Sequence, residues 1–180
     1  MPVLGLTYAA YVALVGGSMI AFDAPREAPG TMPSWLTAVG RTDPQGGAVT
    51  ARQAARSTAV DIEWRPDTLG ALPLPWGLKP VAAAGAFSDG GAWLGLGVRK
   101  DFRVGPVGMT PYTGPVLYQS RLGDGARGNE WLQFRTGFDV WMPVGSAMRL
   151  GIGHYHLSNA QITKGSADTD VWRLSVAWRL

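Results

Sequence analysis

Two histidines, a serine and an asparagine follow one another closely in the run HYHLSNA over residues 154–160, and Asp170 opens the next segment of alternating polarity. A serine hydroxyl is a weak nucleophile that needs a base within hydrogen-bond reach, and the base needs a third group that holds its tautomer. His156, Ser158 and Asp170 are therefore the residue types of a Ser/His/acid hydrolase. Asp168 is the alternative acid.

Alternation along a strand decides which way these side chains point. His156 and Ser158 share a face with Ile152, and Asp170 shares one with Trp172, so the three polar groups are predicted on the apolar sides of two neighbouring strands. Side chains two residues apart on one face have Cα atoms about 6.5–7 Å apart, which an imidazole and a hydroxyl can bridge. A hydrolytic site on an apolar face indicates a lipid substrate.

The hairpin between the two strands sets their relative position. A turn centred near Lys164 would place Asp170 opposite Ser158 and diagonal to His156. His154 lies on the same face and is the competing base, but it is twice as far from Ser158, so we interpret it as a supporting or interfacial residue. An isolated His-x-Ser pair more often ends a strand or forms a turn, and that interpretation is the alternative.

From Trp35 onward the sequence divides into about eight segments of alternating polarity, which predicts strands with two different faces. In residues 58–65 one face is apolar and the other carries Asp61, Glu63 and Arg65. Similar segments cover residues 93–103, where Lys100 interrupts the apolar face, and 130–142 and 171–180. Several segments have about ten residues, the length of a tilted transmembrane strand.

These features predict an all-β protein, an eight-stranded antiparallel transmembrane β-barrel whose charged side chains pair inside the lumen. The connections alternate in length, with long ones such as residues 43–50, 122–128 and 161–169 mostly on one side, which we take as external. The short turn at residues 88–91 does not fit this rule. Pro111 and Pro115 are unfavourable inside a strand, so the fifth segment is the weakest of the eight.

The composition of the chain excludes several classes of site and partner. The chain has 180 residues, 46% of them hydrophobic and 16% charged, which is enough for one domain. It contains no cysteine, so thiolate nucleophiles and cysteine-based zinc sites are excluded. The net charge is +3, but the basic residues are scattered, which argues against a nucleic-acid partner. Hydrolysis by a serine nucleophile needs no metal or cofactor.

Residues 1–24 form an apolar segment in which the first 22 residues carry no charged side chain. This predicts an export signal, although a basic start and a clean cleavage site are missing; a retained anchor helix and a mis-assigned start are the alternatives. Residues 25–180 then form the barrel domain.

The chain resembles the outer-membrane lipid A 3-O-deacylases, also called PagL-like proteins or acyloxyacyl hydrolases. The resemblance is strongest over residues 132–180, in an aromatic-rich strand with Gly137, the run LGIG at 150–153, and the motif His156-x-Ser-Asn-Ala. Looser similarities lie at AWLGLG (92–97) and PYTGP (111–115). The resemblance implies an eight-stranded barrel with its site facing the outer leaflet, in agreement with the parity argument.

The resemblance also implies roles for single residues. His156 would be the base, Ser158 the nucleophile and Asp170 the acid, without metal or cofactor. The chain departs from the family pattern at Asp170, where the family has Glu, and at Gln161, where it has Gly. Lys164-Gly165-Ser166 replaces an Asn-Pro-Gly element.

Backbone N–H groups around Asn159, Ala160 and Gln161, with the Asn159 side chain, are the expected oxyanion donors. Arg121, Arg127 and Lys164 lie near the presumed external rim and are candidates for contacts with phosphates or sugars.

We therefore expect an esterase in the bacterial outer membrane that removes an ester-linked acyl chain from lipid A. Its partners are lipid A or lipopolysaccharide as substrate and membrane lipid, and a homodimer is left open. Two alternatives from other classes remain: a non-catalytic small outer-membrane barrel and an exported lipid-binding β-barrel. The acyl position and any activity on phospholipids are not determined by the sequence.

Overall fold

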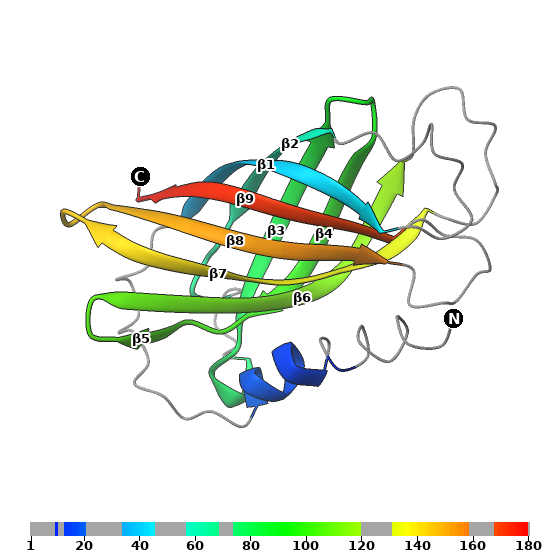
Figure 1. Ribbon diagram of the computed structural model, residues 1–180. Coiled ribbons are helices and arrows are strands. Elements are labelled where there is room, and N and C mark those ends of the chain that lie inside the picture. Colours follow the sequence, from blue (N-terminus) through cyan, green and yellow to red (C-terminus); the bar gives the residue numbers. More distant parts are fainter. Residues whose placement is uncertain are drawn as a thin grey trace.

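A computed structural model describes residues 10, 13–20, 34–45, 57–68, 74–119, 131–158 and 168–179. The strands and one short 3-10 turn follow in the order β1 (Trp35–Gln45), β2 (Thr58–Trp64), η1 (Pro75–Gly77), β3 (Lys79–Phe87), β4 (Ala92–Arg99), β5 (Phe102–Val104), β6 (Val107–Gln119), β7 (Leu132–Val144), β8 (Met148–Ser158) and β9 (Asp168–Trp178). The strands lie side by side and curve around a common axis (Figure 1).

All the strand pairs are antiparallel, and each strand pairs with its sequence neighbours, except that β4 and β5 do not pair with each other. Pairing of β1 with β9 and of β4 with β6 closes the sheet. β4 and β5 pair with β6 in one register, from Arg99 opposite Tyr112 to Phe102 opposite Met109, so together they form one barrel strand. The result is a closed eight-stranded antiparallel barrel, and the predicted fold class is confirmed.

The two faces of each strand differ as the alternation predicts. On β2, Val60 is 58% exposed on the outer face, whereas Asp61 and Glu63, which face the lumen, are 2% and 1% exposed. The same outward pattern of exposed apolar side chains occurs on β4, β8 and β9, for example at Leu96, Ile152 and Leu174. The outer wall is thus apolar and the interior is polar, as in barrels that cross a membrane with their strands.

Charged side chains fill the interior in a balanced network of three carboxylates and three guanidinium groups. Arg173 donates to Asp139 at 2.9 Å, to Glu63 at 2.6 Å and to Asp61 at 3.2 Å. Glu63 also accepts from Arg65 at 2.7 Å and from Arg135 at 2.5 Å, and Arg65 bonds Asp139 at 2.5 Å. The predicted pairing of charged side chains inside the lumen is therefore present.

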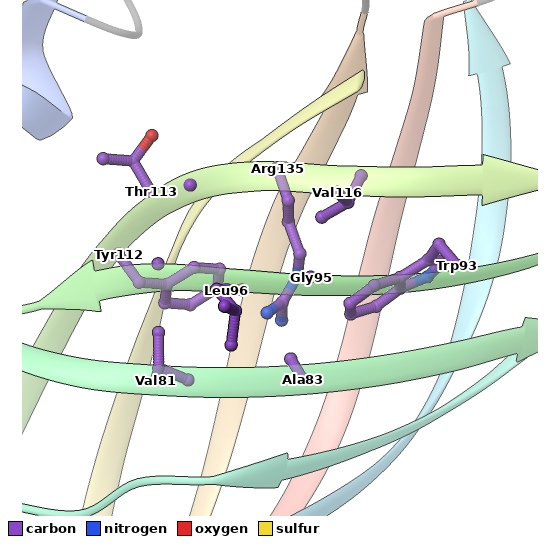
Figure 2. A pocket seen from close by; sticks show the side chains of 11 residues that line it. Val81, Ala83, Trp93, Gly95, Leu96, Tyr112, Thr113, Val116 and Arg135 are labelled. Carbon is purple, nitrogen blue, oxygen red and sulfur yellow. The ribbon is translucent and has the colours of Figure 1, made fainter. Parts of the chain in front are cut away.

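Aromatic rings surround one of these cations. The Arg135 guanidinium lies 4.3 Å from the ring centre of Tyr112, 4.5 Å from that of Tyr155 and 4.8 Å from that of Trp93. Figure 2 shows Arg135 reaching from its strand toward Ala83, between Tyr112 and Trp93. Cation–π contacts of this kind strengthen when the cation is desolvated, so the rings and the carboxylates together stabilise the buried charge.

Both prolines lie inside β6, which has thirteen residues. The carbonyl of Pro111 accepts a hydrogen bond from the Lys100 backbone N–H, so the Pro111 nitrogen also faces the β4–β5 side. Pro115 is four residues further on and faces the same side. The ladder is interrupted opposite both prolines, at Leu96–Gly97 and at Lys100–Asp101. The N–H groups that the two prolines lack therefore fall where the ladder is already interrupted. The fifth predicted segment, the weakest of the eight in the sequence, forms a complete strand.

The connections follow the predicted division by length only in part, because residues 65–78 form a long connection at the end that otherwise has the short turns 105–106 and 145–147. Residues 46–57, 120–131 and 159–167 join strands at one end, and the short turn 88–91 lies at the same end. Two predicted boundaries are wrong: β1 extends through residues 43–45, and β9 begins at Asp168 rather than Asp170. Both corrections come from β1–β9 pairing, which continues to Gln45 opposite Asp168 and supplies backbone partners beyond the local turn signals.

Residues 13–20 are helical, and in the view of Figure 1 this segment lies below β6. Val15 and Met19 are buried, and Lys100 Nζ donates to the Met19 carbonyl oxygen at 2.8 Å. This contact accounts for the lysine that interrupts the apolar face of the fourth segment. Among the described residues, no helix is long and apolar enough to cross a bilayer.

Candidate active site

The end of β8 carries the candidate base and nucleophile on the outer wall. Ile152 and His154 point outward, whereas Tyr155 and Leu157 are fully buried in the interior. His156 and Ser158 therefore occupy outward positions, as the alternation requires. They are only 7% and 2% exposed, in contrast to the apolar side chains further along the same face.

Asp170 lies on the outward face of β9, directly opposite His156. Its Oδ1 atom is 2.8 Å from His156 Nδ1. A carboxylate only accepts hydrogen bonds, so His156 Nδ1–H is the donor and Nε2 is left as the basic nitrogen. This orientation of the ring is the one that a Ser/His/acid mechanism requires of its base.

The register corrects one prediction. Asp170 was expected opposite Ser158 and diagonal to His156, but the β8–β9 pairing places it opposite His156 itself. A shift of two residues between strands keeps every side chain on its own face, so alternation cannot distinguish the two registers. The observed register brings the acid and the base together, with Ser158 one outward position closer to the end of the strand.

His154 lies closer to this pair than its separation from Ser158 suggested. Its Nε2 atom is 3.3 Å from Asp170 Oδ1, the same oxygen that His156 approaches. Its ring packs against Trp172 at a centroid distance of 4.7 Å and faces Phe138 at 6.2 Å. Asp170 is thus contacted by two imidazoles from one strand.

Two threonines continue the polar line across the wall. Thr136 lies opposite His156 on β7, and Thr113 lies opposite Thr136 on β6, with 2.9 Å between their hydroxyl oxygens. Asp170, His156, Thr136 and Thr113 therefore occupy one row across four adjacent strands. The sequence did contain a signal for Thr136, because it is the polar residue between Phe134 and Phe138 in an otherwise apolar outward stripe.

Other predicted residues lie outside the described part of the chain. These are the expected oxyanion donors Asn159, Ala160 and Gln161 and the rim residues Arg121, Arg127 and Lys164. The alternative acid Asp168 begins β9 and pairs by register with Gln45.

Two further features bear on the chemistry that the site can support. Within the described ranges, no cluster of three His, Asp or Glu side chains has the arrangement of a metal site. The small pocket in Figure 2 lies inside the barrel wall, where Trp93, Tyr112 and Arg135 meet Gly95 and Gly97, and it does not include the candidate triad. The outward positions of His156, Ser158 and Asp170 on β8 and β9 place the candidate site on the outer wall of the barrel rather than in the lumen.

Comparisons with known proteins support the fold. No family model and no curated protein matches the chain. Its structure resembles the crystal structure of the outer membrane enzyme PagL, with a TM-score of 0.55 and 16% identity over 81% of this chain and 99% of that one. Neisserial surface protein A gives a TM-score of 0.54 and 11% identity over 81% and 96% of the two chains. A designed transmembrane β-barrel gives 0.51 and 11% identity over 87% and 100%.

These structures include an enzyme, a surface protein and a designed barrel, at identities at which likeness extends to the fold alone. The chain therefore has the fold of outer-membrane β-barrels, and its activity has to be argued from its own residues.

Proposed function

We propose that this protein is a serine esterase of the bacterial outer membrane that hydrolyses an ester-linked acyl chain of lipid A. The observation that carries the proposal is the hydrogen bond between Asp170 Oδ1 and His156 Nδ1, 2.8 Å long, on the outer wall of the barrel and on the same face as Ser158. Ionisable groups facing lipid are costly and mark functional positions.

The mechanism follows from the roles of the three side chains. Asp170 orients His156 and stabilises the imidazolium, while His156 Nε2 takes the Ser158 hydroxyl proton as Oγ attacks the ester carbonyl carbon. The tetrahedral intermediate collapses, the sugar alcohol leaves with the proton from His156, and the acyl group stays on Ser158. A water molecule deprotonated by His156 then attacks the acyl-enzyme, which releases the fatty acid and restores Ser158.

The position of the triad favours a lipid that lies alongside the barrel. The interior is filled by paired charged groups, so the lumen is not an apolar channel for an acyl chain. The apolar outer wall below the triad, with Ile152 and Leu174 exposed, offers a surface along which an acyl chain can pack. This arrangement also disfavours the exported lipid-binding barrel, which would need an apolar cavity.

The proposed substrate is the 3-O-linked acyl chain of lipid A, as the motif resemblance implies. We keep Asn159 to Gln161 as the proposed oxyanion donors. A non-catalytic barrel, in which Ser158 and Asn159 simply end a strand, is the competing function.

Purified protein refolded in detergent is incubated with lipopolysaccharide, and lipid A is analysed by mass spectrometry. The wild type should produce lipid A lighter by one hydroxyacyl chain, and Ser158→Ala should stop this loss. Ser175→Ala is the matched control, because Ser175 is a buried serine on the inner face of β9. If both variants lose the activity to the same extent, or if Ser158→Ala releases the acyl chain as the wild type does, the proposed esterase function is refuted.

A further inference from the structure

His154 is an outward polar residue of β8 that the mechanism above does not use. Its Nε2 atom is 3.3 Å from Asp170 Oδ1, and His156 Nδ1 is 2.8 Å from the same atom. Because a carboxylate is an acceptor only, both imidazoles donate to this oxygen. Asp170 thus lies within reach of donors from two successive outward positions of the neighbouring strand.

The His154 ring is itself held in place. Trp172 lies directly opposite it on β9 and Phe138 directly opposite on β7, and their ring centres are 4.7 and 6.2 Å away. The imidazole therefore sits in an aromatic row that crosses three strands, one outward position before the row of the triad. A ring fixed on both sides can hold its hydrogen-bond partner in one orientation at little further cost in side-chain entropy.

The geometry points to His154 as a positioning residue that fixes the Asp170 carboxylate toward His156; this inference rests on the proposed esterase function. Asp170 faces His156 straight across the strand pair, and rotation of its carboxylate would turn Oδ1 away from Nδ1. A second donor on the same oxygen opposes that rotation. It thereby keeps the proton of His156 on Nδ1, so that Nε2 is unprotonated and can act as the base toward Ser158.

Three substitutions at His154 separate this role from packing. His154→Phe keeps an aromatic ring between Trp172 and Phe138 but has no donor. His154→Gln places an amide N–H near the position of Nε2, whereas the shorter His154→Asn does not reach it. We expect kcat on lipopolysaccharide to fall about tenfold in the Phe and Asn variants, the lower range for a hydrogen bond to a charged group, with KM unchanged. His154→Gln should return kcat to within about threefold of the wild type.

A double-variant cycle tests whether His154 acts through Asp170. In an Asp170→Asn background the carboxylate is gone, so His154→Phe should change the residual kcat by less than about twofold. A tenfold loss that persists in this background would overturn the inference, because His154 would then act by another route. Equal loss in the Gln and Phe variants would also overturn it.

A spectroscopic readout does not depend on turnover. The chain contains two histidines, so an untagged protein labelled with 15N-histidine gives one pair of Nδ1 and Nε2 signals for each ring, and His154→Phe leaves the pair of His156 alone. We expect His156 to carry its proton on Nδ1 in the wild type and in His154→Gln, and to show a mixture of tautomers in His154→Phe. An unchanged His156 tautomer in His154→Phe would refute the positioning role.

Failure of this inference is distinguishable from failure of the proposed function. If Ser158→Ala keeps the activity, the esterase mechanism is wrong and the role of His154 falls with it. If Ser158→Ala is inactive and His154→Phe has wild-type kcat, only the role of His154 is wrong.

Discussion

Replacing Arg173 by Met removes the most connected cation of the barrel interior while keeping a side chain of similar length. Arg173 is fully buried and bonds three carboxylates: Asp139 at 2.9 Å, Glu63 at 2.6 Å and Asp61 at 3.2 Å. Three carboxylates and three guanidinium groups balance in this network, so Arg173→Met leaves one uncompensated negative charge in the lumen.

The size of the effect depends on which partners remain. Glu63 keeps two other arginines and Asp139 keeps Arg65, whereas among the described residues Asp61 keeps only the Tyr155 hydroxyl, at 3.0 Å, as a hydrogen-bond donor. Breaking a buried ion pair by removing one partner costs about 3–5 kcal/mol, because the other charge stays desolvated. Arg173→Met should therefore lower the free energy of unfolding by about this amount.

Adding Asp61→Asn to Arg173→Met removes the orphaned charge and supplies the matched control. The double variant should recover about 1–3 kcal/mol relative to the sum of the two single changes. Urea unfolding in detergent, followed by tryptophan fluorescence, measures each free energy. Additive effects of the two substitutions, or wild-type stability of Arg173→Met, would show that the interior charges are not coupled as the distances indicate.

Two further predictions concern the barrel wall. A Cβ at Gly137 would lie 2.3 Å from the His154 carbonyl oxygen and 2.7 Å from Tyr155 Cβ, so Gly137→Ala should destabilise the barrel by about 1–3 kcal/mol in the same urea assay; wild-type stability would contradict this close approach. Ile152 is 57% exposed on the apolar wall, and Ile152→Arg should cost about 2–4 kcal/mol in lipid vesicles if the residue lies near the bilayer midplane. The same change at Val104, exposed at the end of β5, should cost less than about 1 kcal/mol, and equal costs would place the hydrocarbon layer elsewhere.

Much of the architecture could be predicted because side-chain alternation is a local property. The outward positions of His156, Ser158 and Asp170 follow from their spacing to Ile152 and Trp172, and the charged inner face of β2 follows from the same rule. The two prolines of β6 made that strand unfavourable by local criteria. Pairing shows that their missing donors fall where β4 and β5 interrupt the ladder.

Register, by contrast, is a property of two strands together. A two-residue shift leaves every face unchanged, so the sequence could not distinguish Asp170 opposite Ser158 from Asp170 opposite His156. The contact of His154 with Asp170 depends on the same register, so the sequence could not predict it either. The predicted oxyanion donors lie outside the described residues, and their role remains a prediction.

Period-two alternation needs no tertiary contact. The sequence alone, in residues 154–160 and at Asp170, therefore determined that a base, a hydroxyl and an acid face the apolar side of two adjacent strands. Closure of the barrel decided the rest. Pairing of β8 with β9 brought Asp170 onto both histidines, and pairing across the sheet aligned Thr136 and Thr113 with them. Such contacts join residues from different strands, and only the folded sheet specifies which residues meet.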